Sequence, residues 1–251
     1  MRYHPLFNLF FISFLVLNFS TGCKKEDERL PLSGKIAGTI QTWDDKLVST
    51  TDAEGFTVTI TSLPNTSTTT DANGKFSFEN LPYDQYDFSF TKTGYGTYRV
   101  YGLTHQNNAD GVTNIPLIGL GKISTTTITN LEVKSNTLNG EPGVSFNYGI
   151  NPVPSTSSKA FVRYFLGTTA DVSNTKYTAY SSVINFSNLS NNTGFTTSEL
   201  IGMGFQSGQT IYVKLYGDSF KSNDYLDPNT GIRIFPNINP TTVPAVSFVI
   251  P

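Results

Sequence analysis

Few side chains of this chain could carry out nucleophilic or metal chemistry. It has one cysteine, Cys23, and two histidines, His4 and His105. A serine or cysteine nucleophile needs a partner base, and a multi-histidine metal site needs several ligands in one place. His105 stands in the polar stretch 104–108, which indicates a solvated loop residue. We therefore predict no catalytic residue, no metal site and no cofactor.

Carboxylate pairs are the remaining route to catalysis. Glycoside hydrolases use two acids whose carboxyl groups are about 5–10 Å apart. The sequence offers Asp84 with Asp87, and Asp224 with Asp227. Both pairs fall in segments rich in turn-forming residues, so we interpret them as surface charges. A carboxylate-dependent glycoside hydrolase is kept as an alternative.

The oxygen-rich stretch 223–229 is also a candidate calcium site. Asn223, Asp224, Asp227 and Asn229 supply the hard oxygen ligands that Ca²⁺ takes. These residues do not follow the EF-hand pattern, and a turn centred on Pro228 accounts for the same composition. We favour the turn.

The first 22 residues have the order of a signal peptide. Arg2 precedes an apolar run over 6–19, and the small residues of 20–22 lead directly into Cys23. A helix needs about 20 apolar residues to cross a bilayer, and this run is shorter. We expect residues 1–22 to be removed.

Cys23 resembles the lipobox cysteine of bacterial lipoproteins. The resemblance implies a diacylglyceryl thioether on Cys23, cleavage before it and acylation of the new amino group, and two or more acyl chains suffice for stable anchoring. The charged run 24–29 is similar to the surface-export signal of Bacteroidetes lipoproteins, and it also fits a solvated tether. The resemblance implies a lipid-anchored outer-membrane protein exposed at the cell surface.

The charge balance argues against nucleic acid as a partner. Of the 17 Lys and Arg residues only Arg2 falls within 1–22, so 16 remain against 19 Asp and Glu, a formal net charge of −3. A phosphate backbone binds to a basic stripe, and beyond Lys24 and Lys25 the basic residues are scattered singly. The expected partners are the membrane, through the lipid, and a glycan or an outer-membrane protein complex.

From residue 33 onward the hydrophobic pattern has a period of two, which predicts an all-β chain. The strands expected in the first half span 36–40, 56–60, 76–78, 86–90 and 98–100. Asp71, Asn73 and Gly74 predict a turn, because Asp and Asn bond to their own backbone and Gly adopts positive φ. The segments 66–70 and 187–193 are rich in Ser, Thr and Asn and are interpreted as loops.

A turn, an aromatic strand, a Leu-Pro bend and a second aromatic strand follow one another over 71–90, and the series ends in Gly94 and Tyr95. This order resembles the carboxypeptidase regulatory-like domain, over about residues 33–119. The resemblance implies a transthyretin-like (prealbumin-like) β-sandwich, classed with carbohydrate-binding-like folds. One departure is Asp84, where the family usually has glycine; aspartate tolerates the left-handed backbone better than most residues.

A second β-sandwich is expected after the break at 119–121. Its predicted strands span 126–133, 144–148, 161–166, 176–180, 183–186, 211–216, 231–235 and 245–250, and 198–203 is interpreted as one helical turn. The approach over 207–210 into strand 211–216 resembles a fibronectin type III or other immunoglobulin-like domain. The predicted organisation is a signal peptide (1–22), an acylated tether (23–32), a prealbumin-like sandwich (33–119) and an immunoglobulin-like sandwich (122–251).

Aromatic rings are the candidate ligand-binding residues. Trp43, Tyr83, Tyr95 and Tyr101 are interpreted as an exposed platform, because flat rings stack on the faces of sugars. Trp43 stands out because it lies in the stretch 41–45, which is interpreted as a polar loop. The alternative is that most of these rings simply cover strand faces.

Together these observations favour a non-catalytic, surface-anchored lipoprotein built from two tandem β-sandwich domains. Its expected role is binding or scaffolding, such as carbohydrate binding or assistance to nutrient uptake. Two alternatives stay open: a structural spacer or adhesion-type module, and the carboxylate-dependent hydrolase.

Overall fold

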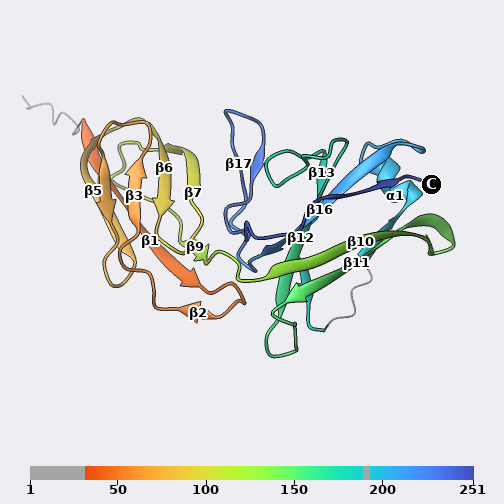
Figure 1. The fold of residues 1–251 in the computed structure, drawn as a ribbon. Coiled ribbons are helices and arrows are strands. Elements are labelled where there is room, and N and C mark those ends of the chain that lie inside the picture. Colours follow the sequence, from red (N-terminus) through yellow and green to blue (C-terminus); the bar gives the residue numbers. More distant parts are fainter. Residues whose placement is uncertain (1–31, 189–192) are drawn as a thin grey trace, which may run out of the picture. The chain divides into compact units, whose positions relative to one another are not determined.

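The computed structural model describes residues 32–188 and 193–251. The predicted signal peptide, Cys23 and the charged run 24–29 lie outside the described residues. The regular secondary structure of the described residues is almost entirely β-strand, which confirms the all-β fold class (Figure 1). Pro31–Pro251 forms one compact unit. No helix in the described ranges is long and apolar enough to cross a membrane.

The first sheet of the N-terminal half is organised around β1 (Ser33–Trp43). One edge of β1 pairs with β5 (Lys75–Pro82) and, further along, with β2 (Ser49–Thr50), both antiparallel. The other edge pairs with β8 (Val112–Asn114) and then with β9 (Ile118–Gly121), both parallel. β1 is therefore the central strand of its sheet.

A second sheet packs against the first one in the order β4-β3-β6-β7. Its strands are β4 (Ser67–Thr69), β3 (Thr57–Ile60), β6 (Gln85–Thr91) and β7 (Tyr98–Thr104). Alternate residues of both sheets point inward, as in other β-sandwiches. The buried core of this half consists of Ile36, Ile40, Phe56, Val58, Ile60, Phe76, Phe78, Leu81, Tyr86, Phe88, Phe90, Tyr95, Ile115, Ile118 and Leu120.

The turn predicted after residue 70 is confirmed. Asp71 Oδ1 accepts hydrogen bonds from the backbone N–H groups of Asn73 (2.9 Å) and Lys75 (2.8 Å). Gly74 has a φ of +72°, and its carbonyl accepts from the N–H of Ile40 at 2.8 Å. The turn therefore starts β5 and also fixes it to the central strand.

The C-terminal half is a second sandwich. One sheet has the order β10 (Thr127–Leu138), β11 (Glu141–Asn151), β15 (Thr193–Thr196). The other has the order β13 (Ala179–Tyr180), β12 (Ala160–Gly167), β16 (Thr210–Asp218), β19 (Val246–Val249), and β14 (Ile184–Phe186) also pairs with β12. A small hairpin joins β17 (Tyr225–Leu226) to β18 (Arg233–Ile234). Both sheets contribute to one core of buried residues.

A short helix, α1 (Thr197–Gly202), follows β15 and confirms the predicted helical turn. It begins with a capping box, in which the Thr196 hydroxyl accepts from the N–H of Glu199 and the Glu199 carboxylate accepts from the N–H of Thr196. Leu200 points into the sandwich core and is 0% exposed. Capping and this one apolar contact together define the helix.

Strand β12 is buried on both faces. Val162 and Leu166 belong to the sandwich core, whereas Phe165 packs into a second apolar cluster on the outside. Between them, Arg163 Nε donates to Asp218 Oδ2 at 2.8 Å, and these two side chains are 3% and 0% exposed. A buried ion pair of this kind is costly to break, because the remaining charge would lack a partner.

The loop predictions over 66–70 and 187–193 are wrong in part. β4 lies within 66–70, and β15 begins at Thr193. β17 lies at 225–226, where no strand was predicted, and the turn predicted around Pro228 follows it and is confirmed. β4 and β17 are two or three residues long with little burial, so they carry no apolar alternation that would distinguish them from loops.

Polar contacts link the two halves of the compact unit. The Asp45 carboxylate accepts from the N–H (2.8 Å) and the hydroxyl (2.7 Å) of Thr125. Asn237, which is 1% exposed, accepts from the N–H of Gly96 and donates to the carbonyl of Lys221. The domain boundary predicted at 119–122 stays a prediction.

Candidate functional site

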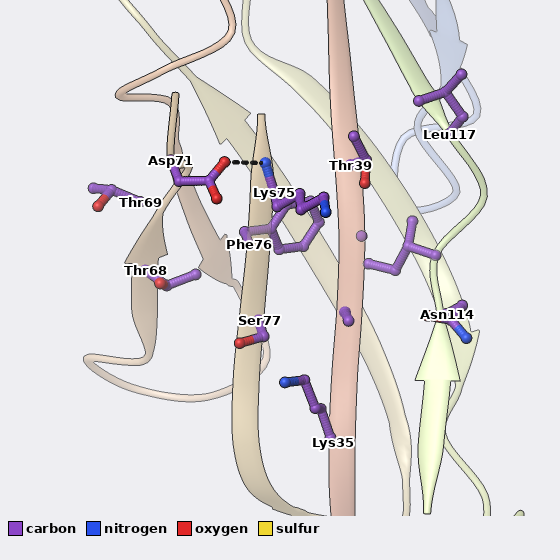
Figure 2. A pocket seen from close by; sticks show the side chains of 13 residues that line it. Lys35, Thr39, Thr68, Thr69, Asp71, Lys75, Phe76, Ser77, Asn114 and Leu117 are labelled. Atoms are coloured by element: carbon purple, nitrogen blue, oxygen red, sulfur yellow. Dashed lines mark hydrogen bonds between the residues drawn. The ribbon is translucent and has the colours of Figure 1, made fainter. Parts of the chain in front are cut away.

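A groove of about 620 Å³ lies on the outer face of the first sheet (Figure 2). Such a volume is within the range of about 300–1,000 Å³ typical of small-molecule sites. We call it the outer groove. It is lined by Lys35, Ala37, Gly38, Thr39, Thr68, Thr69, Asp71, Lys75, Phe76, Ser77, Asn114, Ile115 and Leu117.

The alternation of β1 builds the floor of the outer groove. Ile36 and Ile40 point into the core and are 0% and 2% exposed. Because successive side chains of a strand point to opposite faces, Lys35, Ala37 and Thr39 project outward. The methyl group of Ala37 is the smallest of these three side chains, so the floor is lowest at its centre.

Two cross-strand neighbours flank Ala37. Antiparallel pairing places Ser77 of β5 opposite it, and parallel pairing places Asn114 of β8 on its other side. Directly opposed residues share one face of a sheet. A hydroxyl group and an amide group therefore lie on either side of the floor.

The two sides of the groove come from segments outside β1 and β5. Thr68, Thr69 and Asp71 lie on one side, and Asn114 and Leu117 lie on the other (Figure 2). The large apolar side chains of the described lining are Phe76 and Ile115, which are almost fully buried, and Leu117, which is 63% exposed. The groove thus combines hydrogen-bonding groups with apolar surface, and Leu117 is the most exposed apolar contact.

The two lysines of the groove differ in their partners. Lys35 Nζ lies 2.8 Å from Glu79 Oε1, which also accepts a hydrogen bond from Ser77 at 3.0 Å. The bond from Lys35, followed by that from Ser77, holds the pKa of the Glu79 carboxyl below its ordinary value. Lys75 makes no ion pair with any carboxylate of residues 32–188 or 193–251.

Trp43 does not lie in a polar loop, and that prediction is wrong. It is the last residue of β1 and pairs with Ser49 of β2 and Gly121 of β9. Its half-buried ring packs over Gly119, and Lys221 Nζ lies 4.6 Å from the ring centroid. Pairing on both edges of the strand extends β1 into the stretch 41–43 that polarity alone made look irregular.

His105 is buried, so its interpretation as a solvated loop residue is also wrong. It is 2% exposed, and its Nδ1 lies 2.7 Å from Thr113 Oγ1. Its backbone N–H donates to the carbonyl of Asp84 and so continues the pairing between β6 and β7 by one residue. The ring is turned inward against Tyr83, at 4.8 Å between centroids. The polar residues around it in the sequence remain exposed and hid this burial.

The remaining predicted ligand-binding tyrosines lie in separate places. Tyr95 is 6% exposed and packs edge-on against Phe56 at 4.8 Å, so its predicted exposure is wrong. Tyr83 is half-buried between β5 and β6, and Tyr101 is half-buried on β7 with its ring 6.1 Å from Tyr225. No ring contact in the described part joins any two of Trp43, Tyr83, Tyr95 and Tyr101.

The carboxylates of the first candidate acid pair, Asp84 and Asp87, accept hydrogen bonds from nearby backbone N–H groups. Asp84 Oδ1 accepts from the N–H of Gln85 at 2.7 Å, and Asp87 Oδ1 accepts from the N–H of Gly102 at 2.7 Å. The left-handed residue of this segment is Asn80, with φ +55°, rather than Asp84. Both carboxylates are therefore occupied as backbone acceptors.

The oxygen-rich stretch 223–229 is likewise occupied by protein partners. Asn223 donates to the carbonyl of Gly119, Asp224 binds Arg233 Nη1 at 2.7 Å, and Asp227 accepts from the N–H of Asn229 at 2.9 Å. Among residues 32–188 and 193–251, no group of three or more His, Cys, Asp or Glu side chains could hold a metal ion.

Sequence reasoning missed the residues of the outer groove. Lys35, Thr39, Lys75 and Ser77 alternate with buried apolar residues along β1 and β5, so the period-two pattern already indicated that they share outer faces. Asn114 carried no such signal, because its place depends on parallel pairing between β1 and β8.

Residues 36–117 match the family model of the carboxypeptidase regulatory-like domain. The match confirms the resemblance noted for the first half of the chain. It includes all residues that line the outer groove except Lys35. None of the curated proteins matches this chain.

Several solved structures are similar at low identity. A chain of a mutant type II cohesin-X-dockerin complex from Acetivibrio cellulolyticus is 18% identical, with 44% of this chain and 64% of that chain covered and a TM-score of 0.31. A candidate carbohydrate-binding protein from Bacteroides uniformis is 11% identical, covering 87% and 99%, with a TM-score of 0.28. A DUF3823 family protein from Bacteroides ovatus is 12% identical, covering 87% and 100%, with a TM-score of 0.29.

Proposed function

We propose that this chain is a non-catalytic binding protein whose outer groove takes a carbohydrate. The observation that carries the proposal is the composition of the groove, where hydroxyl groups, an amide and two ammonium groups surround a low floor. A sugar presents many hydroxyl groups, each of which both donates and accepts hydrogen bonds. The groove offers both hydrogen-bond donors and hydrogen-bond acceptors close to one another.

The groups of the groove match a sugar ring in kind and position. Ser77 and Asn114 flank the methyl group of Ala37. A ring placed over Ala37 reaches on one side the Ser77 hydroxyl, which donates to Glu79 and whose oxygen can still accept, and on the other side the Asn114 amide. Leu117, exposed on the rim, supplies an apolar contact for ring carbons. A few placed polar groups together with apolar surface are typical of ligand sites.

Display at the outer-membrane surface is the second part of the proposal. The order of charge, apolar run, small residues and Cys23 supports a lipid anchor that holds the sandwiches outside the cell. In that position the protein presents sugars to a nutrient-uptake complex. Mass spectrometry of the protein from its native host should find acyl chains on an N-terminal Cys23. An unmodified chain that still begins at residue 1 would contradict the anchor.

A glycan array tests the binding role. Residues 31–251 are suitable because they form one compact unit that includes every described core. The array should contain plant, algal and host polysaccharides, and binding to at least one class is expected. Absence of binding across the whole array would sink the proposal.

A matched pair of variants locates the binding. Asn114→Leu removes the amide from the groove, whereas Asn147→Leu makes the same change at an exposed position of β11. We expect N114L to weaken binding at least tenfold and N147L to leave it unchanged. Equal affinities for the two variants would show that the sugar binds elsewhere.

A further inference from the structure

We propose that the ligand of the outer groove is an acidic saccharide, one that carries a carboxylate or sulfate group. This inference rests on the proposed function and names the chemical class of its ligand. The juxtaposition that carries it is Lys75, which has no ion-pair partner in the described part of the chain, at one end of a groove lined with hydroxyl groups. The saccharide's anionic group would bind Lys75, and its hydroxyl groups would bind along the floor.

Lys75 is placed for this role by β5 and its turn. It pairs with Thr39 on the outer face of the sheet, and its backbone N–H is held by Asp71. Figure 2 shows its side chain lying across the groove toward β1. Since the turn uses only the backbone of Lys75, the ammonium group remains available to a ligand.

No carboxylate of the described residues lies within ion-pair distance of Lys75 Nζ. Asp71 is the acid of the described lining, and its Oδ1 accepts from two backbone N–H groups instead of from the Lys75 ammonium group. Glu79 is bound by Lys35 and Ser77, beyond the other end of the floor. Within residues 32–188 and 193–251, Lys35 thus has a carboxylate partner at ion-pair distance, whereas Lys75 has none.

An anionic ligand group gains more at this position than a neutral one. Hydrogen bonds between ionised partners are roughly twice as strong as neutral ones. The interaction is also screened by salt, since the Debye length falls from about 10 Å at 0.1 M to about 3 Å at 1 M ionic strength. Binding of an acidic saccharide should therefore weaken as salt is raised.

The test compares ligands that differ only in charge. Oligogalacturonate and its methyl ester have the same sugar skeleton, and alginate and sulfated galactan oligosaccharides extend the acidic set. Isothermal titration of residues 31–251 should give at least tenfold tighter binding for one acidic oligosaccharide than for its uncharged counterpart. Raising sodium chloride from 20 to 500 mM should reduce that difference.

Variants of Lys75 assign the effect to this side chain. Lys75→Gln should remove most of the preference for the acidic ligand, and Lys75→Arg should keep it. Lys134→Gln is the control, because Lys134 is an exposed lysine of β10, outside the groove lining. Circular dichroism should show the same spectrum for all three variants.

The possible results distinguish a failure of the acidic-ligand inference from a failure of the proposed binding function. Equal binding of charged and uncharged saccharides, unaltered by K75Q, would overturn the acidic-ligand inference and leave the binding role standing. Sodium sulfate that binds as tightly as the acidic oligosaccharide would overturn it too, because the groove would then be a simple anion site. Failure of every saccharide to bind would overturn both.

Discussion

A methyl group at position 74 should destabilise the first sandwich strongly. Gly74 has φ +72°, and a Cβ atom there would lie 2.2 Å from the carbonyl oxygen of Ile40. Gly55 is the natural control, because its φ is +76° and, apart from its chain neighbours, no described residue has an atom within 4 Å of its Cβ position. Gly55→Ala therefore measures the backbone strain alone, whereas Gly74→Ala adds the collision with β1.

The surroundings of Gly55 and Gly74 set how much free energy of unfolding each alanine variant should lose. A left-handed backbone costs a residue other than glycine about 1–2 kcal/mol, and the stiffer unfolded chain offsets about 0.4–1 kcal/mol of it. G55A should thus cost about 1 kcal/mol. At position 74 the collision also weakens the bond from the N–H of Ile40 to the Gly74 carbonyl, about 0.5–1.5 kcal/mol. Forced repacking adds about 1–3 kcal/mol, for a total of about 2.5–5.5 kcal/mol.

Urea denaturation of residues 31–251 measures the difference. Trp43 fluorescence is a suitable probe, because this one tryptophan ends β1 on the same strand as Ile40. The midpoint for G74A should fall well below that for G55A, with both below the wild type. Equal midpoints for the two variants would refute the argument, since the contact between the turn and β1 would then contribute nothing.

Three further predictions concern Asp71, Asp52 and the pair of Arg163 with Asp218. Asp71→Ala should cost about 1–2 kcal/mol in the same urea assay, whereas Asp71→Asn, which keeps the acceptor, should cost about 0.5 kcal/mol or less. The bond from Lys92 is the main cause that lowers the pKa of Asp52 below 3.8. The ionised Asp52 carboxylate therefore stabilises the fold above that pH. The free energy of unfolding of the wild type should exceed that of Asp52→Asn at pH 5, and this difference should shrink as the pH falls to 2. A difference that stays constant over this range would contradict the prediction. Arg163→Met leaves Asp218 buried without its partner and should cost about 3–5 kcal/mol by thermal melting, with the loss largely recovered when Asp218→Leu is added.

The features that the sequence predicted are local ones. The aromatic alternation of β5 and β6, the turn at Asp71 and Gly74, and the single helical turn at 197–202 depend on neighbouring residues. Short-range physical rules therefore suffice to place them. The same alternation identified most of the strands of the second sandwich.

The features that escaped prediction depend on long-range pairing. β1 pairs in parallel with β8 and β9, which brings Asn114 into the groove and draws Trp43 into a strand. His105 is buried because its backbone pairs with Asp84 across the strand end, although its sequence neighbours are polar. Local polarity cannot indicate such contacts, since it does not specify which strands meet.

Nuclear magnetic resonance can locate the bound saccharide on the protein residue by residue. An acidic oligosaccharide from the array is titrated into ¹⁵N-labelled protein of residues 31–251. The largest amide shifts are expected at Lys35, Lys75, Ser77 and Asn114, with β13 and the end of β1 at Trp43 unaffected. Shifts that cluster around Trp43 or Tyr180 instead would contradict the assignment of the outer groove as the binding site.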